Sequence, residues 1–171
     1  GNGITVNGTK QVGGIAGDNQ GELQGSAGAY LVSSADKVHA TQGLAGGIAG
    51  VSKGSIRYAA SRCGSVQADE GEAGGITGVN RAGQGIRDCI NYGNVTSSDG
   101  YAGGITATNA GTITNCQVKA ADKGTLKIHS AGVKESGAIC GINTGVISAA
   151  NDSRTMADNT CLLYTSDAAD E

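Results

Sequence analysis

The segment Gly13-Gly14-Ile15-Ala16-Gly17 is the first of five related copies that decide the fold of this chain. The other copies are GGIAG at 46–50, GGITG at 74–78, GGITA at 103–107 and GAICG at 137–141. Their first residues are 13, 46, 74, 103 and 137, so successive copies begin 33, 28, 29 and 34 residues apart. Such a period is typical of stacked supersecondary units and not of a single globular core.

Two further short segments follow each copy and are separated from it by turn residues. In the copy that begins at 103, Asn109 is followed by Gly111 and by the branched residue Ile113. A Gly-x-Val or Gly-x-Leu segment then closes the better copies, as at 93–95 and 124–126. Asn and Gly suit the turns because both tolerate positive φ. The pattern predicts an all-β fold, a right-handed parallel β-helix (solenoid) of about five coils with three short strands per coil.

Equivalent residues of stacked coils should form columns. We expect an inward column of isoleucines, each stabilising the fold by roughly 1.5–3 kcal/mol on burial. Its members are Ile15, Ile48, Ile76, Ile105 and Ile139. We also expect a column of amides that bond to one another and to the turn backbone, with carbohydrate binding as the alternative role. Its members are Asn19, Asn80, Asn109 and Asn143.

The composition suits a narrow coil. Glycine accounts for 31 of the 171 residues, and proline, tryptophan and phenylalanine are absent. Proline cannot donate to a ladder of strands, and a thin coil has little room for large rings. The net charge of −3 is spread along the chain without a basic stripe, so we expect no nucleic-acid partner. No apolar run of about 18 residues occurs, so we expect no membrane span, and we expect a monomer.

The repeat predicts one elongated domain over residues 1–160. The chain begins in mid-pattern, which indicates a fragment of a longer protein. Residues 161–171 do not fit the repeat and look like translated sequencing-adapter read-through, so we expect a non-native tail there.

The five cysteines are Cys63, Cys89, Cys116, Cys140 and Cys161. Cys89 and Cys116 occupy the same repeat position, so they should stack in adjacent coils. Two interpretations stay open: small buried thiols that fill a narrow core, or a disulfide between neighbouring coils.

The sequence gives little support for a catalytic or metal-binding site. A catalytic β-helix needs carboxylates that converge on one face of several coils, and the aspartates here occupy different repeat positions. His39 and His129 are isolated from zinc-binding motifs. We therefore predict no enzyme, no catalytic residue, no cofactor and no metal.

Three loops should leave the same corner of successive coils, at 67–73, 96–102 and 127–136. Loops on one face of a solenoid often bind partners, although they are also where variation in length does no harm. The candidate binding edge consists of Asp69, Glu70, Glu72, Asp99 and Tyr101. Tyr92 is a further aromatic candidate for carbohydrate contact.

The segments 74–95 and 103–126, each with Gly-Gly-Ile followed by Asn, Gly and Ile, resemble the GLUG-type repeat of bacterial surface proteins. That repeat occurs in immunoglobulin A-cleaving metallopeptidases and large adhesins. The resemblance covers residues 12 to about 148, with departures at Ser52 and Ala138 and in the spacing from Gly83 to Ile86.

The resemblance implies an extracellular, cell-surface protein of a bacterium, whose peptidase chemistry would lie in another domain. We therefore expect a non-catalytic stalk or adhesin-like segment. The alternatives are a module that binds host glycan or surface protein through the loop edge, or a β-helix carbohydrate-active enzyme.

Overall fold

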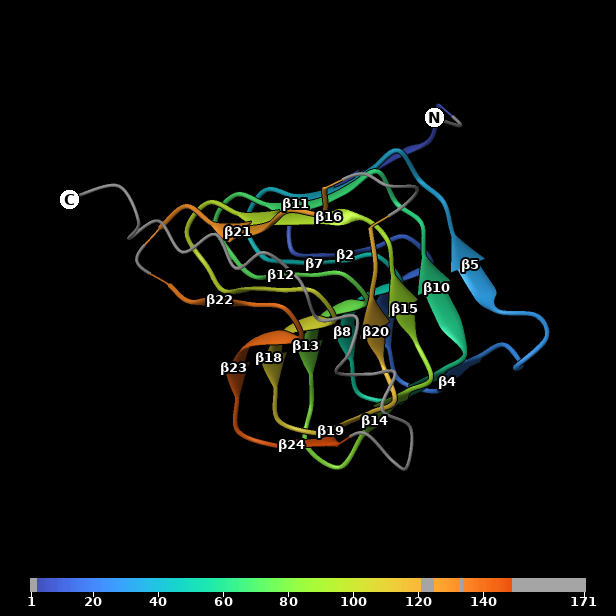
Figure 1. Ribbon diagram of the computed structural model, residues 1–171. Helices are drawn as coiled ribbons and strands as arrows, with labels where there is room; N and C mark the ends of the chain where they lie inside the picture. Colours follow the sequence, from blue (N-terminus) through green and yellow to red (C-terminus); the bar gives the residue numbers. More distant parts are fainter. Residues whose placement is uncertain (1–2, 121–124, 133, 149–171) are drawn as a thin grey trace.

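The computed structural model describes residues 3–120, 125–132 and 134–148. These residues form 24 strands and no helix. The chain passes through five parallel sheets in turn and then returns to the first, so that one circuit makes one coil (Figure 1). The predicted all-β parallel solenoid of about five coils is confirmed.

We number the sheets in chain order. Sheet 1 comprises β1 (Thr5–Gly8), β6 (Lys37–Ala40), β11 (Ser65–Ala68), β16 (Asn94–Ser97) and β21 (Ile128–Ser130). Sheet 2 comprises β2 (Gln11–Gly13), β7 (Leu44–Gly46), β12 (Ala73–Gly74), β17 (Ala102–Gly103) and β22 (Ser136–Gly137). Sheet 3 comprises β3 (Ala16–Asn19), β8 (Ala49–Ser52), β13 (Thr77–Asn80), β18 (Thr106–Asn109) and β23 (Cys140–Asn143). Sheet 4 comprises β4 (Glu22–Gln24), β9 (Ser55–Arg57), β14 (Gly85–Arg87), β19 (Thr112–Thr114) and β24 (Val146–Ser148). Sheet 5 comprises β5 (Leu31–Ser33), β10 (Ala59–Ser61), β15 (Ile90–Asn91) and β20 (Gln117–Val118).

The three segments predicted in each coil lie in sheets 3, 4 and 1. Sheets 2 and 5 add strands of two or three residues at the bends between them. One column differs from the expected register. The sequence pattern places Leu126 beside Val95, whereas the structure pairs Val95 with Ile128. The reason is the longer connection before β21, which runs from 119 to 127.

The isoleucine column lies at the bend between sheets 2 and 3. The amides of Ile48 and Ala49 both donate to the carbonyl oxygen of Ile76, at 2.9 and 3.0 Å, and the same pairing recurs from coil to coil. Ile48, Ile76 and Ile105 are fully buried. Ile15 is 40% exposed, because among the described residues the first coil has a neighbour on one side only.

The paired glycines let the backbone pack against itself. A Cβ on Gly46 would lie 1.7 Å from the carbonyl oxygen of Ala49, within the same bend. A Cβ on Gly75 would lie 2.1 Å from the carbonyl oxygen of Gly104, on the following coil. In the other copies, a Cβ on the second glycine would meet a carbonyl oxygen of the next coil. Ala138 stands at this position in the last described coil, and no described coil follows it.

Ile76→Asp should unfold several coils, because it places a carboxylate at a fully buried position and removes roughly 1.5–3 kcal/mol of burial. Circular dichroism with urea titration measures the loss. Ile15→Asp is the matched control at the exposed end of the same column and should keep most of the fold. Equal losses in the two variants would contradict this account of the column.

Gly75→Ala should lower the free energy of unfolding by about 1–3 kcal/mol or more, because the new methyl group forces two coils apart. Gly21→Ala is the control, since a Cβ on Gly21 meets no atom within 4 Å. Chemical denaturation compares the two. If Gly75→Ala proves as stable as Gly21→Ala, the close approach of coils at Gly75 does not hold.

Candidate functional site

The amide column runs along sheet 3 and bonds from coil to coil. The Asn80 Nδ2 group donates to Asn109 Oδ1 at 2.8 Å, and Asn109 Nδ2 donates to Asn143 Oδ1 at 2.7 Å. In the earlier coils, Asn19 Nδ2 donates to the hydroxyl of Ser52 at 3.1 Å. Asn143 is exposed and the other four side chains are buried. These buried amides hold the turns together and are not positioned to meet a ligand.

The residues of the candidate binding edge do not converge on one site. Asp69 follows β11 and accepts hydrogen bonds from His39 Nε2 at 2.9 Å and Gln67 Nε2 at 3.1 Å. The hydrogen bond from His39 holds the pKa of Asp69 below its usual value. Glu70 and Asp99 are exposed, at equivalent positions of the four-residue connections 69–72 and 98–101.

Glu72 and Tyr101 lie at equivalent positions before β12 and β17. One Glu72 oxygen and the Thr108 hydroxyl are buried near each other, but not in hydrogen-bond geometry, and neither has another hydrogen-bond partner among the described residues. Burial raises the pKa of Glu72, while Thr108 and Arg81 oppose that shift. The Lys134 ammonium lies over the Tyr101 ring in a cation–π contact, with Nζ 5.5 Å from the ring centroid.

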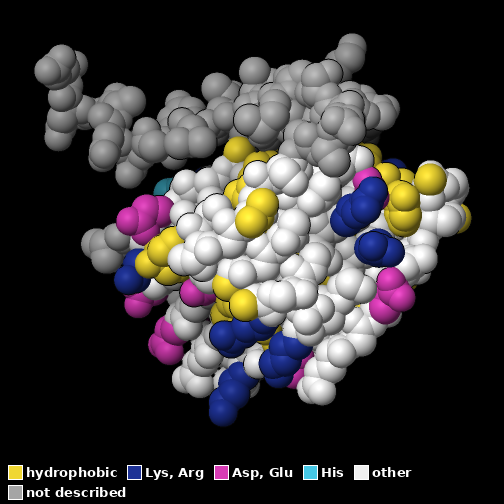
Figure 2. Space-filling view, turned by 90° about the horizontal axis from the view of Figure 1, so that it is seen from below, with side chains coloured by type: hydrophobic (Ala, Val, Ile, Leu, Met, Phe, Trp, Pro, Cys, Tyr) yellow, Lys and Arg dark blue, Asp and Glu magenta, His cyan; other side chains and the backbone are white. Residues whose placement is uncertain are grey.

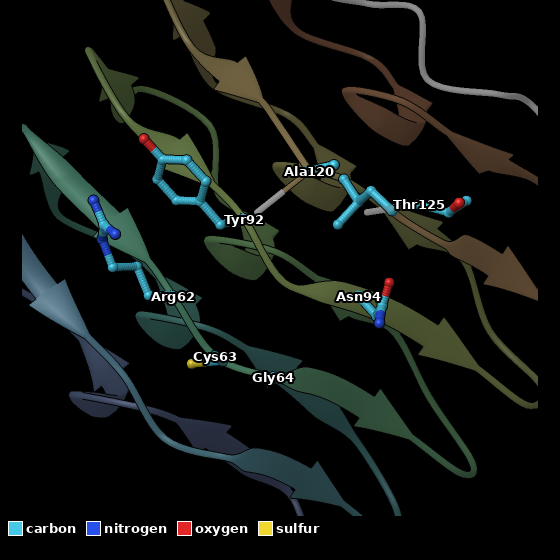
Figure 3. Close-up of a pocket in the computed structure, with 8 residues that line it drawn as sticks. Arg62, Cys63, Gly64, Tyr92, Asn94, Ala120 and Thr125 are labelled. Atoms are coloured by element: carbon cyan, nitrogen blue, oxygen red, sulfur yellow. The ribbon is translucent and has the colours of Figure 1, made fainter. Parts of the chain in front are cut away.

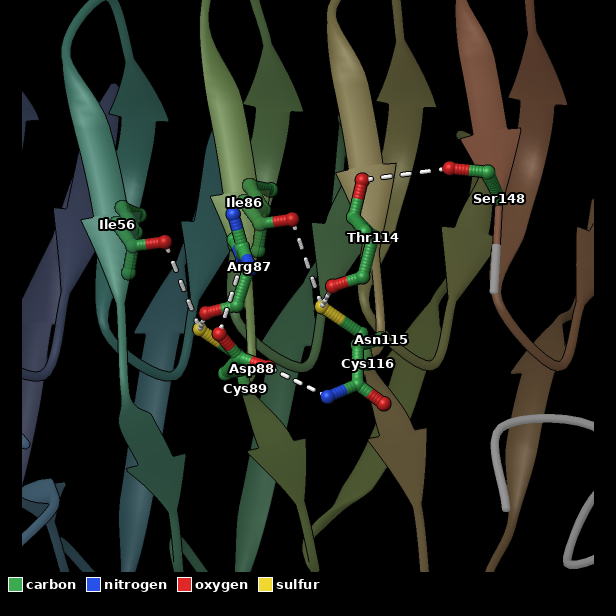
Figure 4. Close-up of polar contacts among 9 residues, drawn as sticks. All are labelled: Ile56, Ile86, Arg87, Asp88, Cys89, Thr114, Asn115, Cys116 and Ser148. Atoms are coloured by element: carbon green, nitrogen blue, oxygen red, sulfur yellow. Dashed lines mark hydrogen bonds and ion pairs between the residues drawn. The ribbon is translucent and has the colours of Figure 1, made fainter. Parts of the chain in front are cut away.

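The four cysteines in the described residues are all free thiols. Cys89 and Cys116 donate to the carbonyl oxygens of Ile56 and Ile86 in the preceding coil, at 3.7 and 3.6 Å (Figure 4). Burial and the neighbouring Cys89 raise the pKa of Cys116, and burial raises the pKa of Cys140 to about 11. The structure therefore agrees with small buried thiols at Cys89 and Cys116. Cys161 lies outside the described residues.

A left-handed corner follows sheet 4. Tyr58, Asp88 and Asn115 have φ values of 47°, 54° and 50°. The Asp88 carboxylate accepts from Arg87 Nε at 3.1 Å and from Asn115 Nδ2 (Figure 4). Asp and Asn tolerate this conformation better than other residues with a side chain. Their recurrence two residues after the isoleucines of sheet 4 was the signal available in the sequence.

Three ion pairs form among the described residues, at His39–Asp69, Lys53–Asp18 and Arg87–Asp88. Lys53 Nζ lies 2.6 Å from Asp18 Oδ2, and this contact lowers the pKa of Asp18. Figure 2 shows acidic and basic side chains on one face of the described residues, without a continuous stripe of either sign. Among residues 3–120, 125–132 and 134–148, no group of three or more His, Cys, Asp or Glu side chains is placed to hold a metal ion.

A pocket that the sequence did not predict opens at the corner between sheets 5 and 1 (Figure 3). Its volume is about 360 Å³. The lining residues are Arg62, Cys63, Gly64, Tyr92, Asn94, Ala120, Thr125 and Leu126. The Arg62 guanidinium lies over the Tyr92 ring, with Cζ 4.7 Å from the centroid. Of these residues, the sequence indicates Tyr92 as a candidate for carbohydrate contact.

No family model matches the chain, and searches of curated proteins and of solved structures find no match either. The resemblance to the GLUG-type repeat therefore stays a prediction. The described residues contain no helix of the length and apolarity that crossing a membrane requires.

Glu72→Gln should stabilise the protein at pH 7, by less than about 1 kcal/mol because the carboxylate is partly exposed to solvent. A raised pKa means that the folded state favours the protonated acid, so wild-type stability is highest below the ordinary pKa of 4.5 and falls as the pH rises through the folded-state value. Urea unfolding at pH 4 and pH 7 should show the gain at pH 7 only.

Glu70→Gln removes a charge from the same connection and serves as the matched control. A gain of equal size in Glu70→Gln would assign the effect to loop charge in general and not to the burial of Glu72.

Proposed function

We propose that the chain is a non-catalytic repeat segment of a bacterial cell-surface protein, exposed outside the cell, where it acts as a stiff stalk. The observation that carries the proposal is the unbroken register of the sheets. Sheet 1 runs through all five coils with Val6, Val38, Val66, Val95 and Ile128 in one line. Such a stack is stiff, so its two ends keep a fixed distance and orientation relative to each other.

Stalk length follows from the same geometry. Neighbouring coils are about 4.8 Å apart along the axis, so five coils span roughly 20 Å between the first and the last. Because each coil contacts only its neighbours, length and stability grow as coils are added. The stalk would thus project an attached domain by an amount set by the number of coils.

The extracellular assignment draws on two further points. The resemblance to the GLUG-type repeat favours a surface protein, and the described cysteines are compatible with oxidising surroundings. Cys63, Cys89 and Cys116 are buried, and thiols that are buried and held in place by packing react slowly with oxidants.

A second candidate function is binding of a host glycan or surface protein through the loop edge. The aligned, exposed carboxylates of Glu70 and Asp99 favour it, because they place two charges side by side on adjacent coils. Substitutions at this edge therefore distinguish a binding module from a stalk.

Removal of residues 74–102 should leave a folded, shorter solenoid. The deletion takes out one complete coil, because Ala73 pairs with Ala102 and Gly74 with Gly103, so Ala73 joins Gly103 in register. Small-angle scattering should show a length reduced by about 5 Å with strand content retained. Removal of 74–88 breaks the register and should unfold the neighbouring coils. An unfolded 74–102 deletion would argue against independent, additive coils.

In the full-length protein displayed on cells, the reach of the domain beyond the stalk should shorten with the 74–102 deletion. It should not change in the double variant Glu70→Gln, Asp99→Asn. If the double variant instead abolishes attachment to host material while the fold is kept, the chain is a binding module and the stalk proposal is wrong.

A further inference from the structure

The pocket between sheets 5 and 1 is built by three successive coils. Coil two supplies 62–64, coil three supplies Tyr92 and Asn94, and coil four supplies Ala120 and 125–126. The connection between sheets 5 and 1 takes three residues in coil two, 62–64, and two in coil three, 92–93, but nine in coil four, 119–127. Ala120 and Thr125 bound the space beside the two short corners on one side (Figure 3). Leu126 also lines it.

The pocket presents one fixed cation and several hydrogen-bond donors. Arg62 is exposed and forms no ion pair within the described residues. Its guanidinium is held over the Tyr92 ring instead, a contact that orients the planar group without neutralising it. Asn94 Oδ1 accepts a hydrogen bond from the Lys127 amide at 2.7 Å, and this fixes the orientation of the side chain and leaves its NH₂ group as a donor.

Aromatic side chains gather beside this pocket. The chain has only five tyrosines and no Phe or Trp. Three of the four tyrosines in the described residues flank strands of sheet 5: Tyr30 before β5, Tyr58 before β10 and Tyr92 after β15. Tyr30 and Tyr58 pack edge to face, with centroids 6.2 Å apart. Val32, in β5, is 47% exposed. Sheet 5 thus offers apolar surface next to the cation.

We propose that this pocket binds the carboxylated sugar of an acidic oligosaccharide. Arg62 pairs with the carboxylate through two parallel hydrogen bonds, the geometry that a guanidinium favours. Tyr92 and Leu126 supply apolar wall for the ring of the sugar, and Asn94 and Thr125 hydrogen-bond to its hydroxyl groups. The volume of about 360 Å³ suits one sugar unit and lies at the small end of the range for ligand sites, roughly 300–1,000 Å³.

A carboxylate fits better than a phosphate monoester, which carries close to two negative charges at neutral pH. The pocket holds a single cation among its lining residues, which balances a single charge, and the other lining groups are neutral donors and apolar walls. Further units of the oligosaccharide would extend over sheet 5 toward Tyr58 and Tyr30. The site is separate from the loop edge, and it does not depend on whether the segment also acts as a stalk.

Isothermal titration with two acidic probes, each matched to a neutral partner, tests the proposal. Sialyllactose is compared with lactose, and trigalacturonate with its methyl ester. The expected result is binding of at least one acidic probe in the millimolar range or tighter, and no detectable binding of its neutral partner. Absence of binding by both acidic probes, or equal binding of the neutral partners, would overturn the proposal.

Arg62→Gln should lower the affinity for the acidic probe by roughly tenfold or more, because the substitution removes the charged hydrogen bonds. Arg81→Gln is the matched control: Arg81 is also exposed but lies between β13 and β14, on another side of the coil, and this variant should bind as wild type. Tyr92→Phe should retain binding and Tyr92→Ala should weaken it. Circular dichroism confirms that each variant is folded. Equal binding by Arg62→Gln and wild type, or equal loss in Arg62→Gln and Arg81→Gln, would refute the site.

Discussion

The close contact between backbones of successive coils at the paired glycines is the constraint on which the rest of the structure depends. The second glycine of each pair lies against a carbonyl oxygen of the next coil, and the first lies against a carbonyl oxygen of its own bend. This contact makes the coil narrow, so among the described residues its interior takes Ile, Val, Ala and Cys side chains and no aromatic ring. It also stacks every bend directly above the next, which is why isoleucines and amides form continuous columns.

Because the columns follow from the stacking, much of the fold could be predicted from the spacing of one five-residue segment. Sheets 1, 3 and 4 carry apolar residues or amides at fixed offsets, so their positions were visible in the sequence. Sheets 2 and 5 were not, because their short strands lie at the bends and carry no branched apolar residue or amide at a repeated offset. The register at Ile128 was missed because a connection of variable length precedes it.

The candidate sites were harder to predict, for a different reason. The proposed loop edge grouped Asp69, Glu72 and Tyr101 by their place in the chain, but neighbouring residues of a bend point in different directions. Asp69 turns to His39 on sheet 1, and Glu72 is partly buried near Thr108 of sheet 3. The pocket at Arg62 and Tyr92 depends on the different lengths of the connections between sheets 5 and 1 in three coils. A difference in connection length indicates a pocket only once the positions of the neighbouring coils are known.

The amide column has a direction. Each bonded asparagine donates toward the coil that follows it, so successive amide dipoles align and polarise one another. Ser52 interrupts this relay. Its hydroxyl accepts from Asn19 but donates to the carbonyl of Gly54, and Asn80 Oδ1 is left buried without a donor among the described residues. The amide hydrogen bonds therefore stop between Ser52 and Asn80, and along this column the second and third coils are joined by backbone hydrogen bonds such as that from the Arg81 amide to the Ser52 carbonyl oxygen.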